Sequence, residues 1–462
     1  MTKRTVAMLL FLTLNFLLLS GCNKNGDINP NLDTNQDVIL TIAGSLEEYK
    51  ALESTIVAFS EKYPNCKIEY EYLQDCSETL PKRLAGDDNK IDLFLTSNLQ
   101  ADSPYFPYAL ELYSQGEALD LSGTFDGLIQ NFEFMDTEEG AAKQIYAIPF
   151  GGELRGLYVN KTLLDSHDIK VPTNRTEFLA ACETLSDAGY VPIQGNPGSA
   201  GQQLMYPYVC NLVANADNYD ELYQKINNCE EGISELFRDP MEFTYGLVEA
   251  DYYQYKYIEN EYGFFLESND EIYARDFLNI VSEDGTNYVK KDDVGIVAFM
   301  PRTLSMGAML EKTKADYHSE IEYEFILAPV ADEGGFAYLS PTNGIAINKG
   351  SDYVDWAVEF MDFVFEPDNN VAFAEEDNII PNTKDAYDFI KKEFDIPENQ
   401  ISELGEMTFD YNFYGVINET LVAISKANNP KYMQVDEAGN ETMYPFEYYM
   451  QMLSDGFAAS KE

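Results

Sequence analysis

The sequence between residues 38 and 95 alternates strand-like and helix-like patterns, and this alternation restricts the fold more than any other feature. Residues 38–42 and 91–95 are mostly apolar, and residues 67–73 alternate apolar and polar side chains, as strands do. Between them, apolar side chains recur at helical spacing over 46–59, and a shorter helix is predicted over 80–85. Strand, helix, strand, helix, strand is typical of an α/β fold with a partly parallel sheet.

Polar residues follow two of the predicted strands. Ser45 and Glu47 come after the first strand, and Ser97 and Asn98 come after the third. Ligands of open α/β sheets bind at loops beyond the carboxyl ends of the strands, so these four side chains are candidate ligand contacts. Ser and Asn also favour helix caps and turns, which is an equally simple interpretation of Ser45 and Asn98.

The N-terminal segment predicts the cellular location of the protein. Two basic residues precede an apolar run over 6–19, which is too short and wrongly flanked for a membrane-spanning helix and is typical of a secretory signal. The run ends in Leu-Ser-Gly-Cys22, which resembles the lipobox of bacterial lipoproteins. That resemblance implies a signal peptide over 1–21, a lipidated (palmitate-type) Cys22 and a flexible tether over 22–37 on the extracytoplasmic side of the cell membrane. An ordinary signal peptide with a chance cysteine is the alternative.

The chain is long and strongly acidic. Its 462 residues suggest two domains behind the N-terminal segment. Its formal net charge of −50 repels nucleic acid and anionic lipid headgroups. The cysteines and histidines show no metal-ligand spacing, and the sequence predicts no metal and no cofactor. The cysteines after Cys22 are predicted to be free buried thiols, with a Cys210–Cys229 bridge as the alternative.

Several motifs occur in the order expected of one family. The most recognisable is IYAIPF…LYVNK over residues 145–161. The others are the strand at 91–95, YVPI at 190–193, DVGIVAFMP at 293–301, YEFILAP at 323–329, NGIAIN at 343–348 with the amphipathic helix at 354–365, and IIP at 379–381. Behind a lipobox-like segment, these motifs make the chain similar to extracellular solute-binding protein family 1, the sugar-type receptors of ABC importers.

The resemblance implies a two-lobed α/β fold of the periplasmic-binding-protein type (type II), with the ligand in a cleft between the lobes and helices at the C-terminus. One lobe would comprise 38–148 with 335–380 returning to it, and the other 153–330 with C-terminal helices over 383–462. Hinges are implied near 147–152, 328–329 and 341–344. A ligand that contacts both lobes would stabilise their closed arrangement, which the membrane subunits of the importer would recognise.

Candidate site residues follow from positions matched to the family. Glu153 stands where maltose-binding members carry a ligand-binding glutamate, although a surface carboxylate is the simpler alternative among 80 acidic residues. Arg302 stands where the family often carries a stacking tryptophan, and a guanidinium can stack and donate paired hydrogen bonds. Thr342 and Asn343 fall in a loop that commonly lines the cleft. The one tryptophan, Trp356, is predicted to lie in the core because its helix has core spacing.

Arg155 raises a further hypothesis together with Arg302. Two arginines in one cleft would concentrate positive potential and would favour a solute with a carboxylate or another negative group. The alternative is a salt bridge of Arg155 that points out of its strand.

The sequence therefore favours a non-enzymatic, monomeric receptor that delivers a carbohydrate, most simply an oligosaccharide, to an importer. A secreted carbohydrate-active enzyme is the alternative from another class, because a glycosidase needs a facing pair of carboxylates and acidic residues are abundant. No motif places such a pair. A binding protein for a non-sugar or anionic solute, and a sensor partner, also stay open.

Overall fold

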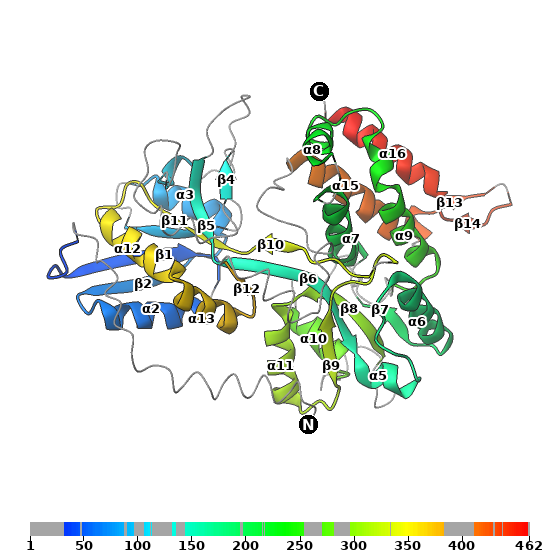
Figure 1. The fold of residues 1–462 in the computed structure, drawn as a ribbon, viewed down its shortest axis with the longest axis horizontal. Coiled ribbons are helices and arrows are strands. Elements are labelled where there is room, and N and C mark those ends of the chain that lie inside the picture. The colour runs from blue at the N-terminus through cyan, green and yellow to red at the C-terminus, as the bar shows by residue number, and fades with distance from the viewer. Residues whose placement is uncertain are drawn as a thin grey trace.

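Two lobes, each built around its own sheet, are joined by extended strands (Figure 1). The α/β fold expected from the sequence is confirmed. The computed structural model describes residues 32–46, 49–86, 90–96, 106–110, 112, 132–134, 144–194, 197–214, 216, 218–253, 270–280, 296–332, 334–382, 411–427, 430–436 and 438–460.

The first sheet has six strands in the order β2-β1-β3-β11-β5-β4. β1 runs parallel to β2 and β3, whereas β11 runs antiparallel to β3 and β5. The predicted partly parallel sheet is confirmed, and a strand from much later in the chain completes it. The bounds are β1 (Val38–Gly44), β2 (Cys66–Tyr72), β3 (Leu93–Thr96), β4 (Phe132–Phe134), β5 (Gln144–Pro149) and β11 (Gly344–Ile347).

Helices cover both faces of the first sheet. Residues of α2 (Lys50–Lys62), α12 (Val354–Phe365) and α13 (Pro367–Asp377) share one core with β1 and β11, and α3 (Cys76–Leu84) packs in a second core on the opposite face. α2 forms because its buried residues recur every three to four positions, as the sequence predicted. Trp356 of α12 is 4% exposed and meets the ring of Tyr63 edge-on, which confirms its predicted place in the core.

The second sheet is organised around the long strand β6 (Gly151–Asn160). The first half of β6 pairs with β10 and β12, and its second half pairs with β8 and β9, while β7 lies beyond β8. The bounds are β7 (Val191–Ile193), β8 (Val297–Thr303), β9 (Tyr323–Ile326), β10 (Leu339–Pro341) and β12 (Ile380–Pro381).

Alternate residues of β6 contact two different cores. Leu157 and Val159 lie in a large core with α6 (Arg175–Asp187), α7 (Pro197–Ala214), α9 (Arg238–Glu249), α15 (Tyr411–Ser425) and α16 (Phe446–Ala459). Tyr158, between them, lies in a smaller core with α10 (Asp270–Phe277) and α11 (Met306–Tyr317). The remaining elements are α5 (Lys161–Ser166), α8 (Tyr219–Asn227), β13 (Gln434–Val435), β14 (Glu441–Thr442) and 3₁₀ turns at Phe106–Tyr108, Ile233–Phe237 and Pro430–Tyr432.

Asn160, near the end of the LYVNK motif, connects two elements of the second lobe through its side chain. The side chain of Asn160 accepts a hydrogen bond from the backbone N–H of Leu163 at 2.9 Å and so caps α5. Its Nδ2 donates to the carbonyl of Val297 at 3.1 Å, which ties the turn to β8. Asn160 is fully buried, so both bonds satisfy groups that water does not reach.

The chain returns to the first lobe later than the predicted residue 335. Phe336 and Tyr338 lie in the large core of the second lobe, and β10 pairs with β6. The crossing occurs at Thr342 and Asn343, directly before β11, because the first half of β6 takes β10 as its partner. Of the predicted C-terminal part, 383–410 lies outside the described residues.

Cys66 and Cys182 are free buried thiols, as predicted, whereas Cys76 is a free thiol that is only half-buried. Burial raises the pKa of Cys66 to about 12 and also raises that of Cys182, so both stay protonated. The Cys210–Cys229 alternative stays untested, because the side chain of Cys210 is outside the described part. Within the described residues, no helix has the length and apolar character needed to cross a membrane.

Candidate functional site at the lobe junction

Three segments connect the lobes and lie against one another. β5 continues through Phe150 into β6, β10 continues through Thr342 and Asn343 into β11, and α13 leads into β12. Pro341 of β10 and Ile380 of β12 both stand opposite Gly152, one on each edge of β6. We call these three connections the crossing segments.

The crossing segment at Thr342 is held by its own hydroxyl. Thr342 Oγ1 accepts from the backbone N–H of Gly151 at 3.1 Å and donates to the carbonyl of Asn343 at 3.0 Å. The backbone N–H of Thr342 donates to the carbonyl of Gly151 at 3.0 Å. Thr342, predicted as a ligand contact, thus uses its hydroxyl within the crossing segment, whereas the side chain of Asn343 is half-buried.

Two buried asparagines hold the other crossing segments together. Asn370 of α13 donates Nδ2 to the carbonyl of Phe150 at 2.8 Å, and its Oδ1 accepts from the backbone N–H of Asn382 at 2.8 Å. Asn382 in turn donates Nδ2 to the carbonyl of Pro149 at 2.9 Å. Both asparagines are fully buried, so they fix the position of β12 against the start of β6.

Glu153 lies on β6 just beyond the crossing. Its Oε1 accepts from the hydroxyl of Ser305, which follows β8, at 3.0 Å. Its negative charge contributes to raising the pKa of Tyr49 and of Asp377, both from the first lobe. The structure therefore places the half-buried Glu153 beside polar groups of both lobes.

Tyr49 and Asp377 form the first-lobe side of this cluster. Tyr49, directly before α2, donates its hydroxyl to Oδ2 of Asp377 at 3.2 Å. Burial raises the pKa of Asp377 to about 6; the bond from Tyr49 opposes this effect, and the charges of Glu153 and Glu376 add to it. Burial, with the charge of Asp377, also raises the pKa of Tyr49, so its hydroxyl stays a donor.

Asp377 is expected to make stability depend on pH. Because its pKa is about 6 when folded and about 4 when unfolded, its ionisation opposes folding above pH 6, and this cost disappears as the pH falls towards 4. Asp377→Asn should therefore be more stable than the wild type by roughly 1–2 kcal/mol at pH 8, allowing for solvent screening. Urea unfolding at pH 8 and pH 4.5 measures the difference. Glu375→Gln, an exposed position on the same helix, is the control and should show no such gap; an equal gap at both pH values would contradict the assignment.

A direct hydrogen bond joins the lobes next to these acids. Asn378, which ends α13 in a left-handed conformation (φ 56°), donates Nδ2 to the carbonyl of Leu304 at 2.6 Å. The hydroxyl of Tyr158 donates to the same carbonyl at 2.6 Å. A Cβ on Gly307 would lie 2.6 Å from Nδ2 of Asn378 and 2.7 Å from the Tyr158 hydroxyl, so only glycine fits there without a shift. These contacts position the turn that carries Ser305.

Arg155 lies between two aromatic rings. Its Cζ is 5.5 Å from the ring centroid of Tyr206 and 5.7 Å from that of Tyr338, within cation–π range. Its Nε is buried without a hydrogen-bond partner, and no ion pair of Arg155 occurs within the described residues. By contrast, Arg83, Arg175 and Arg238 all pair with carboxylates. The salt bridge considered for Arg155 is thus not observed.

Arg302 lies on the other face of the sheet. In the β6–β8 register Arg155 is opposite Thr303, and Arg302 is opposite Gly156. Opposite residues of an antiparallel pair share a face and successive residues alternate, so the two arginines point to different faces. Arg302 is 9% exposed, and its Cζ is 4.0 Å from the ring centroid of Tyr273. The structure does not bring Arg155 and Arg302 into one site.

The remaining predicted site residues are only partly described. Ser45 is exposed directly after β1, in a loop whose Leu46 carbonyl accepts from the hydroxyl of Tyr70 at 2.9 Å. Glu47, Ser97, Asn98 and the predicted lipidation site Cys22 lie outside the described residues. No cluster of three His, Cys, Asp or Glu side chains suited to a metal ion occurs in the part of the chain that is described.

Sequence reasoning missed Tyr49, Ser305 and Asp377. Tyr49 shares the apolar spacing of its helix, and Asp377 is one acid in a short acidic run, so neither differs from its neighbours in pattern. The position of Tyr49 close to the predicted ligand loop at Ser45 and Glu47 was the one available signal. Ser305 had none, because only the fold brings it to Glu153.

Two α/β lobes with three crossing segments and polar groups from both lobes at the junction define a two-lobed binding protein. The family comparison agrees: the model of the bacterial extracellular solute-binding proteins matches residues 43–371. The chain belongs to this family of extracytoplasmic solute-binding proteins. No curated protein matches the sequence.

Solved structures share the fold at low sequence identity. A putative binding protein, MsmE, from Bacillus subtilis in an open conformation is 14% identical, with 93% of this chain and 98% of that chain covered and a TM-score of 0.58. A Bifidobacterium animalis subsp. lactis binding protein of an ABC transporter, in complex with mannobiose, is 14% identical over 95% and 99% of the two chains, with a TM-score of 0.59. A Bacillus licheniformis sugar transporter protein in complex with stachyose is 14% identical over 91% and 99%, with a TM-score of 0.54.

Proposed function

We propose that this chain is the receptor of an ABC importer, and that it binds a carbohydrate, most simply an oligosaccharide, between its two lobes. The observation that carries the proposal is the cluster of Glu153, Ser305, Tyr49 and Asp377, where side chains of both lobes meet beside the crossing segments. Complexes of similar fold with mannobiose and stachyose support a sugar as the solute.

Recognition would combine stacking and hydrogen bonding. Aromatic rings pack on the apolar faces of sugar rings, and carboxylates, hydroxyls and amides bond their hydroxyls. Glu153, Arg155 and Asn343 supply polar groups from the described junction, and Ser45, Glu47, Ser97 and Asn98 would add groups from the first lobe. We assign Thr342 to the hinge and Arg302 to the opposite face of the second sheet, outside the ligand contacts.

The N-terminus would keep the receptor near the importer. Removal of 1–21 and acylation of Cys22 would anchor a monomer to the outer side of the cell membrane through the polar tether 22–37. Mass spectrometry of the protein purified from a bacterial membrane fraction tests this step. A lipid adduct on an N-terminal Cys22 is expected, and a mature chain that starts elsewhere would refute it.

Binding without turnover separates the receptor from an enzyme. Incubation with labelled mannobiose, raffinose and stachyose should give stoichiometric binding of one or more sugars and unchanged ligand on recovery. Release of shorter products would refute the receptor and favour a glycosidase. Tight binding restricted to acidic oligosaccharides would instead favour an anionic solute held by Arg155.

Glu153→Gln is expected to weaken binding of the recognised sugar by about tenfold or more. A hydrogen bond to a charged group contributes roughly 1.5–3 kcal/mol, and about 1.4 kcal/mol corresponds to a factor of ten. Isothermal titration measures the change. Glu324→Gln is the matched control, because Glu324 is also a half-buried strand glutamate but pairs with Lys161 on the far half of the second sheet. Equal affinities of wild type and Glu153→Gln would remove Glu153 from the site.

A further inference from the structure

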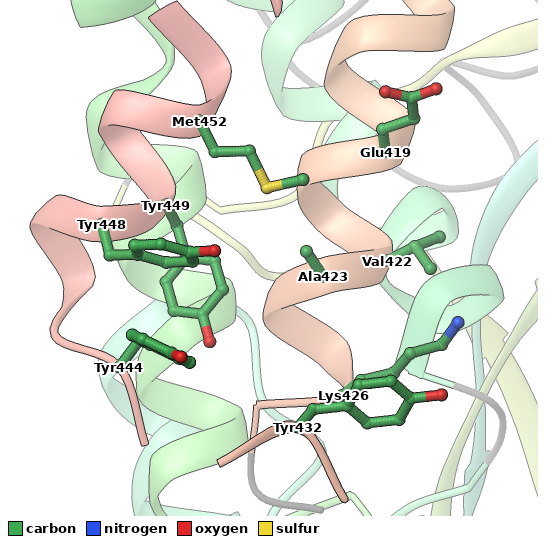
Figure 2. A pocket seen from close by; sticks show the side chains of 9 residues that line it. All are labelled: Glu419, Val422, Ala423, Lys426, Tyr432, Tyr444, Tyr448, Tyr449 and Met452. Carbon is green, nitrogen blue, oxygen red and sulfur yellow. The ribbon is translucent and has the colours of Figure 1, made fainter. Parts of the chain in front are cut away.

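A pocket of about 450 Å³ lies between α15 and α16 of the second lobe (Figure 2). None of its lining residues belongs to a crossing segment or to the cluster around Glu153. Its volume is within the range of small-molecule sites. The pocket is therefore a candidate site separate from the lobe junction.

Tyrosines form the walls of this pocket. Tyr444 and Tyr448 are stacked, with ring centroids 4.3 Å apart and an interplanar angle of 22°, and Tyr449 meets Tyr448 edge-on at 5.2 Å. Tyr432 lies on the opposite side, beside Lys426, whose Nζ is 5.8 Å from the ring centroid. In Figure 2, Tyr444, Tyr448 and Tyr449 lie on one side of the pocket, and Tyr432 and Lys426 lie on the other.

Some of the apolar side chains that line this pocket are exposed to solvent. Tyr432 is 42% exposed, Tyr448 48% and Met452 37%. Nine large hydrophobic side chains are exposed in the described part of the chain, and these are three of them. Three of the exposed apolar side chains therefore lie around one hollow.

Helix α15 supplies the floor of the pocket and the charge of Glu419, and the turn after the helix supplies the opposite charge of Lys426. Ala423 and Val422 are the apolar residues of α15 that line the pocket. Glu419 lies on α15, and Lys426 directly follows Ser425, the last residue of that helix. An acceptor and a donor thus stand at the two ends of an aromatic hollow.

This combination of groups selects a neutral, hydroxyl-rich ring. A sugar offers C–H faces to tyrosine rings and hydroxyls that both donate and accept, so it satisfies Glu419 and Lys426 together. An anion would meet the Glu419 carboxylate and a chain of net charge −50, and an organic cation would meet the Lys426 ammonium. An apolar side chain would offer no hydrogen bond to Glu419 or Lys426.

We propose that the pocket between α15 and α16 is a second carbohydrate site, which holds a segment of a neutral glycan independently of the lobe junction. The second lobe would then bind a polysaccharide at its outer helices α15 and α16. Short sugars bound between the lobes would occupy a different place.

Affinity gel electrophoresis tests the second site with soluble starch, arabinoxylan and galactomannan as the glycans. The wild type should be retarded in at least one of these gels. Tyr432→Ala/Tyr448→Ala should need about tenfold more polysaccharide for the same retardation, because both exposed rings are removed. Glu153→Gln should be retarded like the wild type, which separates this site from the proposed junction site.

Tyr72→Ala is the matched control, since Tyr72 on β2 is 42% exposed, as Tyr432 is. It should leave retardation unchanged, and thermal melting should show that every variant is folded. Three results would overturn the proposal: no retardation in any gel, loss of retardation with Glu153→Gln, or loss with Tyr72→Ala equal to that of the double variant. Displacement of the glycan by a proline-rich peptide at lower concentration than by oligosaccharide would also overturn it.

Discussion

Gly151→Ala is expected to lower the free energy of unfolding by roughly 2–3 kcal/mol and to weaken sugar binding. A Cβ at this position would lie 2.4 Å from the carbonyl oxygen of Ile380 and 2.8 Å from Cδ1 of Ile379. The nearest atom is backbone, and β6 is paired on both edges here, so the clash can be relieved only by moving β12. That movement would change the angle between the lobes, and urea unfolding with isothermal titration would detect both effects.

The control for this substitution is Gly246→Ala. Gly246 lies in α9 with no atom within 4 Å of an added Cβ, so alanine should be neutral or stabilise the helix by up to about 1 kcal/mol. Equal stability and equal sugar affinity of Gly151→Ala and the wild type would show that the crossing segments are not held as closely as described.

Asn370→Leu is expected to cost roughly 3 kcal/mol of stability. The leucine would fill a similar volume but would remove the hydrogen bonds that Asn370 makes with the carbonyl of Phe150 and the backbone N–H of Asn382 in a fully buried place. Each unpaired buried group costs about 1–3 kcal/mol. The loss should appear in urea unfolding and, because Asn370 ties two crossing segments, as a lower affinity for the sugar.

The neighbouring Asn369→Leu separates this effect from a general cost of replacing an asparagine in α13. Asn369 is half-buried and donates to the carbonyl of Phe363 at 2.8 Å, within its own lobe. Its replacement should cost less than 1 kcal/mol on the scale of an ordinary hydrogen bond and leave affinity unchanged. If the two variants lost the same stability, the special role of Asn370 at the crossing would be refuted.

Local patterns predicted the start of the fold well. β1, β2 and β3 and the helices between them lie close to their predicted positions, because each buries a regular set of apolar side chains. The pairing of β3 with β11 could not be predicted from local patterns. β11 comes from residues 344–347, and the sequence of a single strand does not indicate which distant strand it pairs with. The return at Thr342 instead of residue 335 has the same cause, since it depends on β10 pairing with β6.

The candidate site was predicted where a motif marks it and missed elsewhere. Glu153 follows from its distance to LYVNK, and the structure places it at the junction. The grouping of Arg155 with Arg302 did not hold, because strand register sends their side chains to opposite faces. Tyr49 and Asp377 meet only when α2 and α13 pack together, so composition and spacing carry no sign of their contact.

The place of β11 also determines when the first lobe can be completed during synthesis. β11 lies between β3 and β5, so residues 38–149 emerge with two strand edges that have no partner until residue 347 follows. Most strands of the second lobe are encoded inside this interval, and its helices α15 and α16 follow β11, so neither lobe can be completed before the other has begun to form. A chain of this design stays incompletely folded until most of it has left the ribosome.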